Sequence, residues 1–241
     1  MLNVPRVDGT FLQRAETEWP LARTRWTTLH LHPDSTLAAE PGAEDSLELD
    51  ALGSGVELLA APFEQETELT GPASLTVWLS SSTTDADLFV ILRLYDADGE
   101  EVVFQGSNDP GTPLGKGWLR ASHRKLDPAR SEPYRPYHAH DEVQPLEPGE
   151  PVRLEVEIWP LSVIAPAGYR LGLLLQGRDF ERETAARLAN FRVPLRGSGP
   201  YLHDDPTDRP PEVFGGRTTI HMGAAMPSSL LLPVVPEQSR A

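Results

Sequence analysis

Residues 71–104 decide the fold and read GPASLTVWLSSSTTDADLFVILRLYDADGEEVVF. After the Gly-Pro break, apolar side chains alternate with Ser, Thr and Trp up to residue 80. This period of two predicts a strand with one face on a core. A polar run follows, and residues 88–95 are then apolar on both faces except for Arg93, which indicates a central strand. Residues 96–99 (DADG) predict a tight turn that returns the chain over residues 101–104 as a hairpin.

The same alternation recurs along the rest of the chain. It is clearest in residues 152–159, where Val152, Leu154, Val156 and Ile158 share one face and Pro160 ends the run. Further strands are predicted over residues 25–32, 47–50, 56–61, 63–69, 117–126, 169–176, 217–222 and 228–235. Only residues 179–191 (DFERETAARLANF) have a helical pattern. Short strands joined by turns predict an all-β jelly-roll sandwich with at most one short helix.

Two long stretches have no clear pattern. Residues 1–21 look irregular, and residues 127–149 form a predicted loop that contains five prolines. Loops of this length in a compact domain are usually functional or lie across a neighbour.

Composition excludes several classes of function. The formal net charge of −15 repels phosphate backbones, so we expect no nucleic-acid partner. The chain has no cysteine, which excludes disulfides, cysteine metal sites and a cysteine nucleophile. Its first residues show no signal peptide, and its uncharged runs are too short to span a bilayer. We expect a cytoplasmic protein without a membrane partner.

The order of five motifs resembles one known family. These are EWPLART, GPASLTVWLSSSTTDADLFV, GWLRASHR, LEPGEPVRLEVEIWPLSVIAPAGYRLGL, and RTTIHMG followed by SSLLLPVVP. Together they resemble the C-terminal non-catalytic domain of X-Pro dipeptidyl-peptidase and cocaine-esterase-like (CocE/NonD) hydrolases, from about Trp19 to Pro236. The resemblance implies a jelly-roll domain, like galactose-binding domains in fold, that packs on an α/β-hydrolase domain with a Ser-Asp-His triad.

The resemblance also sets the expected organisation of the chain. Residues 1–24 would be a linker from a missing upstream hydrolase domain, and residues 25–241 would be the jelly-roll domain. The accessory domain would help to shape the substrate site of its partner. In esterase-like relatives an early loop reaches toward the substrate, but the matching residues 38–55 lack the apolar pair of those relatives.

No catalytic residue is predicted in this chain. An α/β-hydrolase needs G-x-S-x-G at a strand-to-helix elbow, and that motif does not occur. Ser54 and Ser198 each lie between glycines, but neither follows an apolar strand that leads into a helix, so we interpret both as loop residues.

Clusters of histidine and aspartate were weighed as metal sites. His138 and His140, followed by Asp141, could present two imidazoles, and residues 203–205 (HDD) could complete a site from a distance. We interpret both as polar loops and predict no metal and no cofactor. Asp85 and Asp87 could bind Ca²⁺ or act as acid and base, but we expect them to cap a tight connection between strands.

The five tryptophans leave two uses open. Exposed aromatic side chains stack on sugars in carbohydrate-binding sandwiches, so a stand-alone carbohydrate-binding module is the alternative to an accessory domain. An independent enzyme that uses His and Asp groups of this chain is a third hypothesis. For contact with the hydrolase domain, or for a homo-oligomer, we predict a surface that contains Trp19, Pro20, Tyr134, Tyr137, His138 and His140, because Tyr and Trp suit interfaces.

Overall fold

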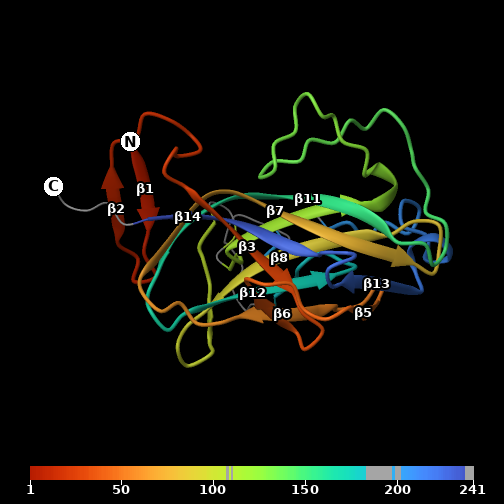
Figure 1. The fold of residues 1–241 in the computed structure, drawn as a ribbon, viewed down its shortest axis with the longest axis horizontal. Helices are drawn as coiled ribbons and strands as arrows, with labels where there is room; N and C mark the ends of the chain where they lie inside the picture. The colour runs from red at the N-terminus through yellow and green to blue at the C-terminus, as the bar shows by residue number, and fades with distance from the viewer. Residues whose placement is uncertain (107–108, 110, 183–196, 199–201, 237–241) are drawn as a thin grey trace.

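The computed structural model describes residues 1–106, 109, 111–182, 197–198 and 202–236 (Figure 1). The strands are β1 (Leu2–Pro5), β2 (Phe11–Arg14), β3 (Arg25–Leu31), β4 (Thr36–Ala38), β5 (Asp45–Asp50), β6 (Val56–Ala60), β7 (Thr67–Ser81), β8 (Asp87–Tyr95), β9 (Glu101–Val102), β10 (Gly115–Arg120), β11 (Val152–Ala165), β12 (Arg170–Gln176), β13 (Arg217–Met222) and β14 (Ser229–Val235). Within the described residues, helix is limited to a 3-10 turn, Ala121–His123, and to α1, Pro211–Phe214. The predicted all-β class is confirmed.

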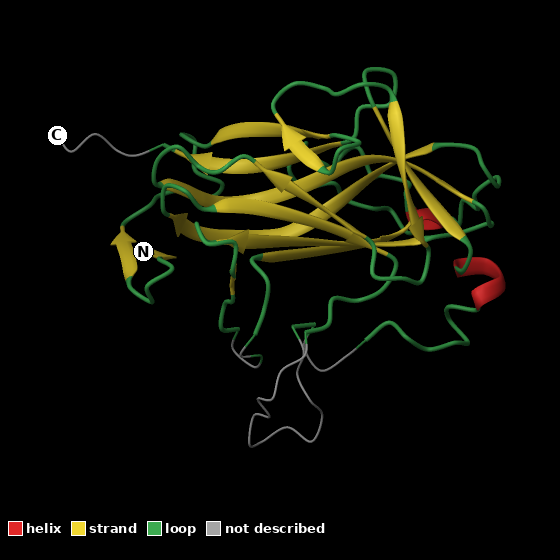
Figure 2. Ribbon diagram, turned by 90° about the horizontal axis from the view of Figure 1, so that it is seen from below, coloured by secondary structure: helices red, strands yellow, loops and turns green. Residues whose placement is uncertain are grey.

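The strand pairings close into a barrel. They run β11-β10-β8-β12-β6-β4-β3-β14-β7, and β7 pairs again with β11, so nine strands form a ring. β13 and β5 extend the sheet beyond β7. Figure 2 shows these strands packed over one another in the body of the molecule. This closed ring does not specifically confirm the predicted jelly-roll sandwich, which stays a prediction.

The two strands of the fold-deciding stretch belong to different parts of this ring. β7 borders β11 on one edge and β14 and β13 on the other, whereas β8 borders β10, β12 and β9. The hairpin predicted at residues 96–99 is present, since Leu94 pairs with Val102 and Tyr95 with Glu101. The polar run between β7 and β8 therefore carries the chain across the barrel.

The predicted apolar stripes form the core. Leu75 and Val77 of β7, and Leu154, Val156 and Ile158 of β11, are all 0% exposed. They belong to one continuous cluster lined by most of the barrel strands. Burying such side chains contributes about 1.5–3 kcal/mol each to folding.

The structure differs from the prediction in the N-terminal residues and at the start of the predicted helix. The first residues are not irregular, because β1 and β2 pair as a hairpin at one end of the molecule (Figure 1). Arg14 binds Glu68 of β7 at 2.5 Å, and Arg6 binds Glu66 at 2.7 Å. These long-range ion pairs hold the hairpin in place, and a local sequence pattern does not reveal them. In the helix predicted over residues 179–191, residues 179–182 are not helical, and residues 183–191 lie outside the described residues.

The long loop between β10 and β11 lies across β7, which is one of the two arrangements expected for a loop of this length. It folds on itself, with Asp127 N–H donating to the Tyr137 carbonyl and Ala139 N–H to the Lys125 carbonyl. Ser74 of β7 donates to the Pro133 carbonyl at 2.8 Å. In Figure 1 this loop rises above β7 and β11, over the face opposite the core.

Candidate functional site

The floor of the candidate site is aromatic and lies on the outer face of β8 and β10. Antiparallel pairing places Trp118 of β10 opposite Phe89 of β8, and their rings stack with centroids 6.0 Å apart. Phe89 also packs with Ile91 and Phe180 in a small second cluster, separate from the barrel core. Because side chains alternate along a strand, the residues between these point into the core instead.

A close approach of β10 and β11 extends this floor. Gly117 pairs with Ile158, and a Cβ on Gly117 would lie 2.2 Å from the Glu157 carbonyl oxygen, so only glycine fits. The ladder between β11 and β7 then shifts, with Trp159 and Pro160 opposite a single residue of β7. Such a bulge re-aims side chains, and Trp159 is 72% exposed.

A buried ion cluster fixes one wall. The side chain of Asp87, which is 0% exposed, accepts hydrogen bonds from Arg120 at 2.9 Å and from Arg209 at 2.8 Å. Arg120 also binds Asp208 at 2.8 Å, and these carboxylates raise its pKa. Arg209 donates further to the carbonyls of His203 and Gly177. The cluster thereby holds residues 202–210 on the sheet.

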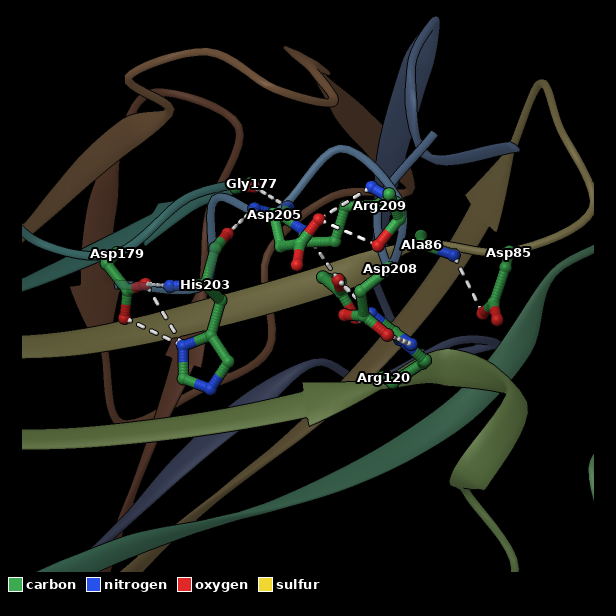
Figure 3. Close-up of polar contacts among 11 residues, drawn as sticks. Asp85, Ala86, Arg120, Gly177, Asp179, His203, Asp205, Asp208 and Arg209 are labelled. Atoms are coloured by element: carbon green, nitrogen blue, oxygen red, sulfur yellow. Dashed lines mark hydrogen bonds and ion pairs between the residues drawn. The ribbon is translucent and has the colours of Figure 1, made fainter. Parts of the chain in front are cut away.

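This anchoring places His203 over the floor. Its ring centroid lies 4.3 Å from that of Trp118, and its Nδ1 lies 3.0 Å from Asp179 (Figure 3). An Asp–His pair is part of a hydrolase triad. The hydroxyl of Ser198, which lines the same cavity, donates instead to the Phe180 carbonyl. Among the described residues, no recorded hydrogen bond joins a serine hydroxyl to the His203 ring.

Three histidines form the opposite wall. The Nδ1 atoms of His123 and His140 lie 3.0 Å apart, which requires one ring to donate and the other to accept. The His138 ring lies 5.9 Å from that of His140. Burial lowers the pKa of His138, and the neighbouring histidines lower it further. The neutral form of His138 is therefore favoured.

These walls enclose an open groove of about 670 Å³, within the usual size of ligand sites. Its lining combines aromatic faces (Phe89, Trp118, Trp159 and Phe180) with polar groups (Lys116, His123, His138, His140, Glu157, Asp179, Ser198, His203 and Asp208). Such a surface can stack on a flat apolar group and accept hydrogen bonds at its edges.

The structure brings only part of the predicted contact surface together. His138 and His140 line the groove. On the same loop, Tyr134 stacks on Trp26 with centroids 4.6 Å apart, and the ring of the exposed Tyr137 lies under the guanidinium of Arg130.

The other two predicted contact residues lie in a different segment. Trp19 is 50% exposed between β2 and β3, and Pro20 follows it through a cis peptide. Among the described residues, no recorded hydrogen bond, ion pair or ring contact joins either of them to the long loop.

The remaining candidates have structural partners. Asp85 accepts from the N–H groups of Ala86 and Ser122, which confirms its capping role. The capping prediction for Asp87 is wrong, since it forms the buried ion cluster. Asp141 pairs with Lys125, and Asp205 caps Thr207.

In the described part of the chain, no group of three or more His, Cys, Asp or Glu could hold a metal ion. No helix of that part is long and apolar enough to cross a membrane.

Sequence reasoning missed the groove itself. The sequence shows Trp118 and Trp159 but gives no sign that they line one groove. His203 lies in a polar stretch that predicts a loop, and no local pattern indicates the contact of Arg209 with Asp87. The one local hint was Gly117, a glycine inside a strand pattern, which often marks the close approach of another backbone.

Comparisons with known proteins agree with this architecture. Residues 4–231 match the X-Pro dipeptidyl-peptidase C-terminal non-catalytic domain. A CocE/NonD family hydrolase of Staphylococcus aureus has a similar structure, with a TM-score of 0.80 and 26% identity over 97% of this chain and 41% of that chain. An aminopeptidase of a marine sediment thaumarchaeon shares the fold, with a TM-score of 0.60 and 14% identity over 95% of this chain and 39% of that one.

A curated relative matches a shorter part. A protein of Mycobacterium bovis named as a serine esterase is 31% identical over 125 residues, which is 50% of this chain and 18% of that protein. This chain thus spans only a minor part of the larger proteins that it resembles. Because the family match covers nearly the whole chain, the protein belongs to the X-Pro dipeptidyl-peptidase C-terminal non-catalytic domain family, found in CocE/NonD hydrolases.

Proposed function

We propose that this chain is the accessory domain of a serine hydrolase of the CocE/NonD type, that it packs on an α/β-hydrolase domain, and that it helps to shape the substrate site there. The carrying observation is the family match over residues 4–231, together with solved relatives in which the matching region makes up 41% of a longer hydrolase chain. The jelly-roll arrangement expected for this family belongs to the same proposal.

The absence of a nucleophile elbow from the sequence supports a non-catalytic role. The Asp179–His203 pair is engaged with Trp118, and Ser198 with a backbone carbonyl. The chemistry would therefore come from the partner domain, for which esters and X-Pro peptides are the substrate classes to test.

We assign this packing to the part of the predicted contact surface that lies outside the groove. Trp19 is 50% exposed and Tyr137 is 42% exposed, and exposed aromatic side chains of this kind are enriched at protein interfaces. We expect Trp19 and the loop around Tyr137 to contact the hydrolase domain, or a second copy of the chain when that domain is absent.

The DNA upstream of the Met1 codon is first searched for a reading frame that encodes an α/β-hydrolase domain with G-x-S-x-G. The test then uses the purified chain and that purified hydrolase domain. The chain alone should hydrolyse neither p-nitrophenyl esters nor X-Pro anilides. Calorimetry should detect a complex with the hydrolase domain, and Trp19→Ala should weaken it while leaving the melting temperature unchanged. Turnover by the isolated chain that a point mutation of the chain abolishes, or a lack of binding to the hydrolase domain, would overturn the proposal.

A further inference from the structure

Two tryptophans in the groove have exposed indole surface, and the Trp118 ring also packs against Phe89 and His203. Trp159 is 72% exposed and Trp118 is 43% exposed, whereas Trp78 is half-buried and Trp26 is stacked on Tyr134. Indoles this exposed are uncommon, because a Trp side chain is buried on average. Both come from rigid strands, and the tight β10–β11 contact at Gly117 fixes their spacing. Trp159, for which no ring contact is recorded among the described residues, therefore offers the more open face for stacking.

A half-buried carboxylate lies in the same groove. Glu157 is on the strand that carries Trp159 and beside the one that carries Trp118. Among the described residues, no recorded hydrogen bond or ion pair involves its carboxylate, and only the more distant charge of Arg135 acts on it. Burial raises the pKa of Glu157. A desolvated acceptor without a donor is costly, so the site favours a ligand that brings hydroxyl donors.

The charged side chains of the groove favour a ligand without negative charge. The groove contains the carboxylates of Glu157, Asp179 and Asp208 and two cations, Lys116 and Arg120. Lys116 donates to the Gly197 carbonyl and burial lowers its pKa, while Arg120 is paired with Asp87 and Asp208. An anionic ligand would meet these carboxylates without a free guanidinium to offset them. Flat aromatic faces with acceptors at their edges suit a molecule that has apolar C–H faces and hydroxyl rims.

We propose that the groove between Trp118 and Trp159 binds a neutral oligosaccharide, which stacks a sugar face on Trp159, contacts the exposed part of Trp118 beside His203, and donates hydroxyl hydrogen bonds to Glu157. The His203–Asp179 pair forms the second polar edge, held in place by Arg209. This site does not depend on the hydrolase proposal, which rests on the family match and on Trp19 and Tyr137.

The experiment titrates the full chain with neutral gluco-, galacto-, manno- and xylo-oligosaccharides, following tryptophan fluorescence and heat, with polygalacturonate as the anionic comparison. At least one neutral series should bind and quench fluorescence, and polygalacturonate should not. Trp159→Ala and Glu157→Ala should each weaken binding at least about tenfold, which corresponds to about 1.4 kcal/mol. Glu157→Gln, which keeps an acceptor oxygen, should retain more affinity than Glu157→Ala.

Trp19→Ala is the matched control, since it removes an exposed indole outside the groove and should leave saccharide affinity unchanged. Melting temperatures should stay the same in all these variants, because the altered side chains are at least partly exposed. The proposal is overturned if no neutral saccharide binds, or if the groove variants bind as well as the natural chain. It is also overturned if the hydrolase domain competes with the saccharide and protects Trp159, which would make the groove an interdomain surface.

Discussion

The two faces of β11 differ in burial and in the contacts that they make. On the inner face Leu154, Val156 and Ile158 are 0% exposed and contact only the common core. On the outer face of the same strand Glu157 lies half-buried and Trp159 is almost fully exposed. Because successive side chains of a strand point to opposite sides, one segment can carry both a core and a recognition surface.

The faces also differ in what holds them. The inner face depends on apolar area, which is non-directional and tolerates changes of partner. The outer face depends on directional contacts between distant residues, such as Arg209 with Asp87, which lie 122 positions apart. We therefore expect inner-face changes to unfold the barrel, and outer-face changes to alter the groove with a smaller cost in stability.

The largest effect is expected from a charge on the inner face. Val156→Asp would bury a carboxylate without a partner, and the free energy of unfolding should fall by at least about 4 kcal/mol. Urea denaturation measures this loss. Arg153→Gln, on the exposed face of the same strand, is the control and should change stability by less than about 0.5 kcal/mol. Equal midpoints for Val156→Asp and the natural chain would show that this face is not core.

Removing the anchor of the outer face should have the next largest effect. Arg209→Met leaves the buried Asp87 with Arg120 as its partner, so the cost should be about 2–3 kcal/mol, below that of an unpaired charge. His203 should also leave Trp118, which fluorescence would report. Arg178→Met, an exposed arginine close to the same segment, should change neither quantity. A normal Trp118 signal in Arg209→Met would mean that other contacts position His203.

The contact between β10 and β11 can be tested at Gly117. Ala at this position would bring its Cβ to 2.2 Å from the Glu157 carbonyl oxygen, and overpacking of this kind costs about 1–3 kcal/mol. At Gly115 on the same strand, the nearest atom to an added Cβ is a side-chain methyl of Ile158 at 3.4 Å. Gly115→Ala should therefore be much milder. If both variants melt alike, the close approach at Gly117 does not limit the barrel.

The smallest effect is expected at the N-terminal hairpin and depends on pH. Arg23, and then Arg14, lower the pKa of Glu16 from 4.5 to about 2. A depressed pKa means that this stabilisation is complete above about pH 4.5 and is lost as the pH falls toward 2. Glu16→Gln should destabilise the hairpin by at most about 1 kcal/mol near neutral pH, and the difference should vanish by about pH 2. Hydrogen exchange of β1 and β2 measures it, and a difference that does not change with pH would contradict the assignment.

Local pattern was enough for much of the fold. The period-two stripes of β7 and β11 predict their buried faces, because burial on one side of a strand leaves a mark on every second residue. The turn at residues 96–99 and the presence of a long loop at residues 127–149 also follow from composition. The order of motifs along the chain indicated the family. The stripes and the turn are each contained in a few consecutive residues, whereas the family signal comes from the order of short motifs along the chain.

Other features were decided only by tertiary structure. The β1–β2 hairpin is short and was read as irregular, because its partners Glu66 and Glu68 lie more than fifty positions away. The groove joins Trp118, Glu157 and His203 from three separate segments, and the position of His203 depends on Arg209 reaching the buried Asp87. The sequence determined which faces of the strands are apolar. Only the closure of the barrel decided which exposed residues became neighbours, because that follows from strand pairing between distant segments.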